Sequence, residues 1–239
     1  MIRTLYNKYC PSAVKKQLKF LRKRLKQVDM GRLDRFKPFS TRFGYDRGGP
    51  VDRVYIEGFL AENADVIRGK VLEIADNVYT IKFGGTKVTK SEILHINDEN
   101  PKATIVGDLT ALSHEFDGQF NCIILTQTLH LIYDYKEALK TCRRLLAPGG
   151  SLLLTVPGIT NIDHDDWGKL FYYSFTSHSM EKLAGEIFPG DKASVKYYGN
   201  IKTATAFLYG LGVDEITSSS YEKNDPHYQV IISLKITRP

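Results

Sequence analysis

Cysteine and tryptophan are scarce in this chain, and long apolar runs are missing. Its 239 residues include three cysteines and one tryptophan. Cys10, Cys122 and Cys142 form neither a paired framework nor a close metal-binding spacing, which is typical of a reducing compartment. No apolar run reaches the roughly 18 residues that a membrane-spanning helix needs, and the basic first residues lack a signal-peptide core. The sequence therefore predicts a cytoplasmic protein without a transmembrane segment.

Glycine-rich phosphate cradles are also absent. A dinucleotide-binding unit needs G-x-G-x-x-G after its first strand, and a P-loop needs G-x-x-x-x-G-K-[ST]. The corresponding turn here, residues 75–79, contains no glycine, and no P-loop motif occurs anywhere. The acids show no metal-ligand spacing, so a magnesium-dependent mechanism is not expected. A polyphosphate ligand is therefore disfavoured.

What the chain does contain is a series of apolar strands, two of which carry an acid near the carboxyl end. Five runs are predicted to be strands: residues 71–75, 92–96, 103–109, 120–125 and 151–157. The acids are Glu73 in the first run and Asp108 in the third. Such carboxylates suit the hydroxyl and amino groups of an adenosine ligand.

Helices and further strands complete the expected domain. Helices are predicted from residue 51 toward 66, from near Leu129 to 147, from Ser177 onward behind a serine or threonine cap, and over 202–212. Strands are predicted over 195–198 and 228–236. We expect a main domain over residues 38–239, preceded by a helical extension over residues 1–37.

The extension is strongly basic. Between residues 15 and 26 there are seven cations and no acid: Lys15, Lys16, Lys19, Arg22, Lys23, Arg24 and Lys26. An apolar stripe shares this segment at helical spacing: Val14, Leu18, Leu21, Leu25 and Val28. The helix is expected to pack by that stripe, with a nucleic acid, lipid or protein partner as the alternative. It could cover the adenosine ligand or mediate a homodimer.

Together these segments resemble the class I S-adenosylmethionine-dependent methyltransferases over about residues 40–239. The resemblance rests on the first strand and turn (71–77), the pair Asp108 and Leu109, the fourth-strand motif (116–124) and the Pro-Gly-Gly turn (145–153). It implies an α/β, Rossmann-like seven-stranded mixed sheet flanked by helices, with the last strand inserted antiparallel. It also implies S-adenosyl-L-methionine as the cofactor.

The resemblance assigns the cofactor contacts to the strand ends. Glu73 would meet the ammonium of the ligand, although a nearby backbone N–H or an arginine is an alternative partner for this carboxylate. Asp108 would accept from the adenine amine, and the N–H of Leu109 would reach a ring nitrogen. The remaining expected contacts are Ala75 and Asn77, where the family has glycines, His95 and Asp98 beside the ribose, and Gln127 near the methyl group.

His130 is the expected catalytic base. It follows the fourth strand, where the methyl group would be presented, and a hydroxyl acceptor must lose a proton that a histidine can take. Helix capping or packing is the alternative role. In the charged segment 38–60, Arg42 and Arg47 are expected to bind a ligand carboxylate or phosphate, or else to hold the loop by salt bridges.

A narrower resemblance bears on the acceptor. Residues 42–48, 123–130 and 198–200 resemble a bacterial subgroup encoded with glycosyltransferases and other glycan-assembly enzymes. It implies a sugar-containing acceptor and glycan-assembly enzymes as partners. The loop after the fifth strand, 158–176, is acidic and then aromatic. His164, Trp167 and Tyr172 are its expected substrate contacts, with an aromatic core cluster as the alternative.

The sequence therefore predicts a methyltransferase that O-methylates a sugar or glycan-linked intermediate in surface polysaccharide biosynthesis. Two alternatives stay open. One is a noncatalytic adenosine-site protein that binds partners through its basic helix. The other is an RNA methyltransferase, although no RNA-binding signature accompanies the basic helix.

Overall fold

The computed structural model describes residues 11, 14, 16–17, 30–164 and 168–239. The chain divides into two compact units, Met1–Lys37 and Pro38–Pro239. In the first unit, Val14 is helical and Gly31–Leu33 forms a 3-10 helix. Most of the predicted basic helix, residues 18–26, lies outside the described residues, as does most of its apolar stripe.

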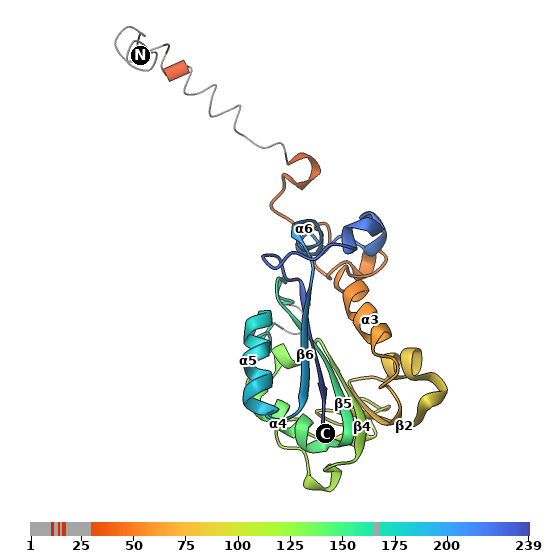
Figure 1. Cartoon of the computed structure of the whole chain (residues 1–239). Coiled ribbons are helices and arrows are strands. Elements are labelled where there is room, and N and C mark those ends of the chain that lie inside the picture. The colour runs from red at the N-terminus through yellow and green to blue at the C-terminus, as the bar shows by residue number, and fades with distance from the viewer. Residues whose placement is uncertain (1–10, 12–13, 15, 18–29, 165–167) are drawn as a thin grey trace. The chain divides into compact units, whose positions relative to one another are not determined.

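The second unit is built on one seven-stranded sheet, drawn in Figure 1. In chain order the strands are β1 (Gly69–Ile74), β2 (Val88–His95), β3 (Ile105–Val106), β4 (Phe120–Thr126), β5 (Leu146–Pro157), β6 (Lys192–Tyr198) and β7 (Ile231–Thr237). Their order across the sheet is β3-β2-β1-β4-β5-β7-β6. The first five strands are parallel, and β7 runs antiparallel between β5 and β6. The predicted Rossmann-like mixed sheet is confirmed.

Helices cover both faces of the sheet, as Figure 1 shows. They are α3 (Asp52–Glu62), α4 (Tyr135–Leu145), α5 (Ser177–Ile187) and α6 (Ile201–Leu208). Side chains alternate along each strand, so Leu72 and Ile123 pack in a core cluster with residues of α4 and α5. Ile124 and Leu153 point the other way and pack with residues of α3 and α6. This two-sided burial explains why the strands read as continuous apolar runs.

Several predicted boundaries were wrong for identifiable reasons. The third strand is shorter than predicted because a turn begins after Gly107, where Asp108 accepts a hydrogen bond from the N–H of Thr110 (2.8 Å). The first helix ends before residue 66 because Asn63 turns its amide back to the carbonyl of Phe59 (2.8 Å). The helix predicted over residues 202–212 ends at Leu208, because Gly210 has a φ of +65°, which is outside the helical region.

The connections that follow β4 and β1 also differ from the sequence prediction. The chain after Leu129 first forms a 3-10 turn, Leu129–Leu131, and α4 begins only at Tyr135. Between β1 and β2 there is a π-helix, Thr80–Gly84, which the sequence did not predict. The predicted cap of α5 is confirmed, because Thr176 accepts a hydrogen bond from the N–H of Ser179 (3.2 Å).

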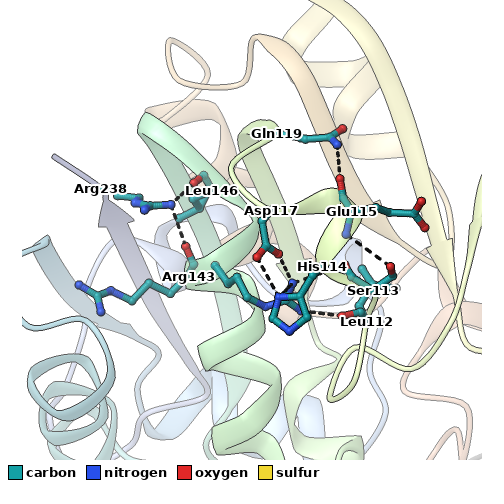
Figure 2. A network of polar contacts seen from close by, with 10 residues as sticks. Leu112, Ser113, His114, Glu115, Asp117, Gln119, Arg143, Leu146 and Arg238 are labelled. Carbon is teal, nitrogen blue, oxygen red and sulfur yellow. Dashed lines mark hydrogen bonds and ion pairs between the residues drawn. The ribbon is translucent and has the colours of Figure 1, made fainter.

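A polar network fixes the amino edge of the parallel strands (Figure 2). Arg144, at the end of α4, donates to the carbonyl of Leu112 (2.6 Å) and pairs with Asp117 in the connection to β4. Arg238, just after β7, donates to the carbonyls of Arg143 and Leu146. These contacts hold one edge of the sheet and leave the opposite edge for a site. Among the described residues, no helix combines the length and apolarity needed to cross a bilayer.

Candidate active site

A cavity of about 1000 Å³ lies at the carboxyl ends of the parallel strands. Its wall includes Ile74 of β1, His95 of β2, Thr126 of β4 and Pro157 of β5. The strand order reverses between β1 and β4, and open α/β sheets bind ligands at such a switch point. The segment before α3 and the first turns of α3 close the cavity on another side.

At the end of β1, the carboxylate of Glu73 is bound by its own chain. One oxygen accepts from the N–H of Tyr79 (3.2 Å), and the other accepts from the N–H and the hydroxyl of Thr80 (both 2.7 Å). Burial raises its pKa to about 7, although these hydrogen bonds act in the opposite direction. Backbone N–H groups are therefore partners of Glu73 in this structure. Ala75, which also lines the cavity, holds φ of +71° without being a glycine.

The ends of β2 and β3 bring His95, Asp108 and Leu109 to the cavity wall. His95 Nδ1 lies 3.0 Å from the carbonyl oxygen of Asn97, and Leu109 is buried. Two other predicted cofactor contacts, Asn77 and Asp98, are not among the described residues that line the cavity. Asn77 donates its amide to the hydroxyl of Ser91 (3.1 Å), and Asp98 is exposed in the turn after β2.

The end of β4 brings Gln127 and His130 to the wall. Gln127 has φ of +47°, a costly conformation that is concentrated at functional sites. The His130 ring is buried, and its centroid lies 4.6 Å from that of Phe171. Its Nδ1 has no hydrogen-bond partner among the described residues. Burial lowers the pKa of His130 to about 4, so the ring is uncharged at neutral pH.

The predicted substrate contacts do not gather at one place. Arg42 lines the cavity. Arg47 forms a salt bridge with Glu215. This contact agrees with the alternative prediction, that Arg47 holds the loop by a salt bridge. His164 and Tyr172 are exposed and are not among the described wall residues, and Trp167 lies outside the described residues. Tyr172 instead meets the ring of Tyr133 edge-on at 5.3 Å.

Comparison with known proteins identifies the family. A family model described as a methyltransferase domain matches residues 43–186, which is more than half of the chain. The chain belongs to this methyltransferase family. It is an S-adenosylmethionine-dependent methyltransferase, and its cavity lies where the fold binds a ligand. A search of curated protein sequences finds no match.

Solved structures, among them two SAM-dependent methyltransferases, share the fold at low sequence identity. A SAM-dependent methyltransferase from Archaeoglobus fulgidus has a TM-score of 0.51 at 8% identity, over 78% of this chain and 94% of that one. A SAM-dependent methyltransferase from Thermotoga maritima has a TM-score of 0.51 at 15% identity, over 79% and 92%. The [4+2]-cyclase SpnF has a TM-score of 0.50 at 13% identity, over 79% and 81%.

The charge of the cavity fits the sulfonium ligand of this methyltransferase. Six acids line it: Asp52, Glu57, Glu73, Asp76, Asp108 and Asp163. Two guanidinium groups face them, those of Arg42 and Arg53. Burial raises the pKa of Glu73 and of Asp52, but the other four acids still outnumber the two guanidinium groups, in a chain whose formal net charge is +6. A cation is therefore favoured in the cavity over a polyphosphate. Among the described residues, no cluster of three or more His, Cys, Asp or Glu side chains could hold a metal ion.

Sequence reasoning missed five charged residues of this wall, which are Asp52, Arg53, Glu57, Asp76 and Asp163. Asp52 and Arg53 open α3, and both lie in the charged 38–60 segment from which Arg42 and Arg47 were chosen. The available signal was the position of Asp52 and Arg53 within one helical turn of the apolar residues Tyr55 and Ile56, both of which are buried. Charges so close to the apolar face of a helix lie near the interior and need a partner there.

Proposed function

We propose that this methyltransferase transfers the methyl group to a hydroxyl of a sugar or glycan-linked intermediate in surface polysaccharide biosynthesis. The observation that carries the proposal is the buried, uncharged imidazole of His130, which lies in a largely apolar part of the wall with Leu131, Ile132 and Phe171. A neutral acceptor suits such surroundings, because burying an unpaired charge there would be costly.

The donor would occupy the strand-end part of the cavity. When bound, S-adenosylmethionine supplies an electrophilic methyl group on its sulfonium sulfur. Asp108 and Leu109 are proposed to hold the adenine, and His95 the ribose, since Asp98 points to solvent. Ala75 and Gln127 would border the amino-acid end. Asn77 would act indirectly by fixing the turn through Ser91.

His130 is proposed to take the proton of the acceptor hydroxyl. The acceptor hydroxyl would supply the oxygen lone pair that takes up the methyl group, the donor would leave as a neutral thioether, and the hydroxyl proton would pass to the imidazole of His130. Although burial makes His130 a weak base, the methylated oxonium is a far stronger acid than an imidazolium. The proton transfer is therefore downhill late in the reaction.

Aromatic side chains beside the cavity support a sugar acceptor. Phe171 lines the cavity, and the residue after it, Tyr172, belongs to a connected set of rings with Tyr133 and Tyr173. The hydroxyl of Tyr173 donates to the carbonyl of Tyr133 (3.0 Å), which fixes two of these rings. Exposed ring faces with phenol hydroxyls suit the apolar faces and hydroxyls of a sugar. His164 and Arg42 would bind at the rim.

Transfer of a radioactive methyl group to a panel of nucleotide sugars and lipid-linked sugars tests the proposal. We expect label in one sugar, and no label in the matched deoxysugar that lacks the accepting hydroxyl. Label in the deoxysugar, or in an amine only, would exclude O-methylation. Methylation of RNA that disappears when residues 1–30 are removed would support the RNA alternative. Donor binding without transfer to any acceptor would support the noncatalytic one.

The proposed substrates also imply a cellular compartment and partners. Cys122 and Cys142 are buried free thiols, which suits the reducing cytoplasm where nucleotide sugars would be used. Glycan-assembly enzymes are the proposed partners. A homodimer through the N-terminal unit is proposed as the oligomeric state, and light scattering of the full chain and of residues 38–239 would test it.

A further inference from the structure

Asp52 is a buried acid of the cavity wall, and one of its carboxyl oxygens has no hydrogen-bond partner among the described residues. Only 7% of the residue is exposed, and it lines the cavity. Its Oδ1 has no hydrogen-bond partner among the described residues. An acceptor left unpaired in the interior costs free energy, more so when it is charged. Burial accordingly raises the pKa of Asp52, and a positively charged donor from a ligand that reached this oxygen would satisfy it.

Glu73 does not leave such a place. It is 2% exposed, and both of its oxygens already accept hydrogen bonds from Tyr79 and Thr80. Its carboxylate holds the turn after β1 in shape. Both acids line the cavity, and of the two only Asp52 has a buried oxygen without a hydrogen-bond partner among the described residues.

Arg53, the next residue, also lines the cavity and is held in place by two phenols. Its Nε and Nη2 donate to the hydroxyl of Tyr45 (3.2 and 2.6 Å), and its Nη1 donates to that of Tyr79 (3.1 Å). A guanidinium has five N–H donors. These three bonds therefore leave two donors for another acceptor, on a side chain whose rotamer is already fixed.

The contacts of Tyr79 locate this pair relative to the sheet. Tyr79 follows β1, its N–H binds Glu73, and its hydroxyl binds Arg53. Arg53 is thereby tied to the turn after β1. This turn has no glycine that would let a ligand approach the backbone closely, and Ala75 keeps its methyl group there. Side chains must therefore make the ligand contacts that the backbone of a glycine-rich turn would otherwise make.

We infer that Asp52 and Arg53 form a zwitterion clamp for the amino-acid end of the methyl donor. The carboxylate of Asp52 accepts from the α-ammonium, and the guanidinium of Arg53 donates to the α-carboxylate. The inference rests on the cavity being the donor site and is independent of which acceptor is methylated.

Calorimetric titration of the full chain with two ligands tests the clamp. S-Adenosylhomocysteine carries the amino-acid end, and 5′-methylthioadenosine lacks it. The variants are Asp52→Asn, Arg53→Gln and Arg53→Lys, with Glu62→Gln as the control on the same helix. Glu62 pairs with Lys196 and is not on the cavity wall. Asp52→Asn keeps the shape of the side chain and removes a buried charge, so it should fold.

We expect Asp52→Asn and Arg53→Gln each to weaken S-adenosylhomocysteine binding about 10-fold to 100-fold, as for lost charged hydrogen bonds. Affinity for 5′-methylthioadenosine should stay within about 2-fold, and Arg53→Lys should recover part of the loss. Equal weakening of both ligands, or no weakening of S-adenosylhomocysteine, would overturn the clamp. Failure of the wild-type chain to bind either ligand would instead refute the donor site itself, and with it the clamp.

Discussion

Glu73 offers a direct test of how burial and hydrogen bonding compete in this fold. The residue is almost fully buried at the end of β1, where its carboxylate accepts hydrogen bonds from Tyr79 and Thr80. Burial outweighs these bonds and raises its pKa from 4.5 to about 7. Glu73→Gln keeps the length of the side chain and removes its ionisation. The variant should therefore have a different dependence of stability on pH.

The sign and size follow from proton linkage. Because the pKa of Glu73 is higher in the folded than in the unfolded state, its ionisation destabilises the fold above pH 7. That penalty is relieved as the pH falls through 7 and is gone below 4.5. At about 1.4 kcal/mol per pH unit, the full penalty is about 3 kcal/mol, of which about 2.5 kcal/mol is relieved between pH 8 and pH 5.

Urea denaturation at a series of pH values measures this effect as a difference between wild type and Glu73→Gln. The difference is needed because His130, whose pKa is lowered to about 4, changes stability in the opposite direction below pH 6.5. We expect the difference in unfolding free energy to change by about 2.5 kcal/mol between pH 8 and pH 5. Glu62→Gln serves as the exposed control and should show almost no change. A pH-independent difference for Glu73→Gln would refute the reasoning.

Three further predictions concern catalysis, the amino edge of the sheet and the cavity loop. His130→Asn should lower kcat about 100-fold or more with little change in donor affinity; an unchanged kcat would remove His130 as the base. Arg144→Ala should lower the unfolding free energy by about 2–3 kcal/mol in urea titrations, because the carbonyl of Leu112 loses a charged donor; weaker donor binding at full stability would contradict this structural role. Gly44→Ala should cost about 2–4 kcal/mol, since Gly44 has φ of +92° and a Cβ there would lie 2.7 Å from the carbonyl oxygen of Leu211. A melting temperature equal to that of wild type would contradict this prediction, because it would show that the loop moves to make room for the Cβ.

The fold was largely predictable from the sequence because its signals are local and strong. Apolar runs such as residues 120–125 and 151–157 are typical of strands buried on both faces, and Thr176 is a recognisable helix cap. The boundaries depend on single contacts that a pattern does not reveal. One example is the amide of Asn63 folding back onto Phe59.

The site was predictable only where a strand fixes the position of a residue. Asp108 and Gln127 follow strands β3 and β4, and the structure brings both to the cavity wall. The loop residues could not be resolved in this way, because Arg42, Arg47 and Arg53 look equivalent in the sequence. Their environments differ through long-range partners, such as Glu215 for Arg47.

The position of β7 has a consequence for how the chain is made. β7 pairs with both β5 and β6, although it is the last strand in chain order. At synthesis rates of about 5–20 residues per second, β5 would wait roughly 4–16 s before residues 158–237 have followed it. During that interval the edge of β5 that will pair with β7 has unpaired backbone N–H and C=O groups. Such an edge readily pairs with another chain. Nascent chains of this protein should therefore depend on chaperones until translation passes β7.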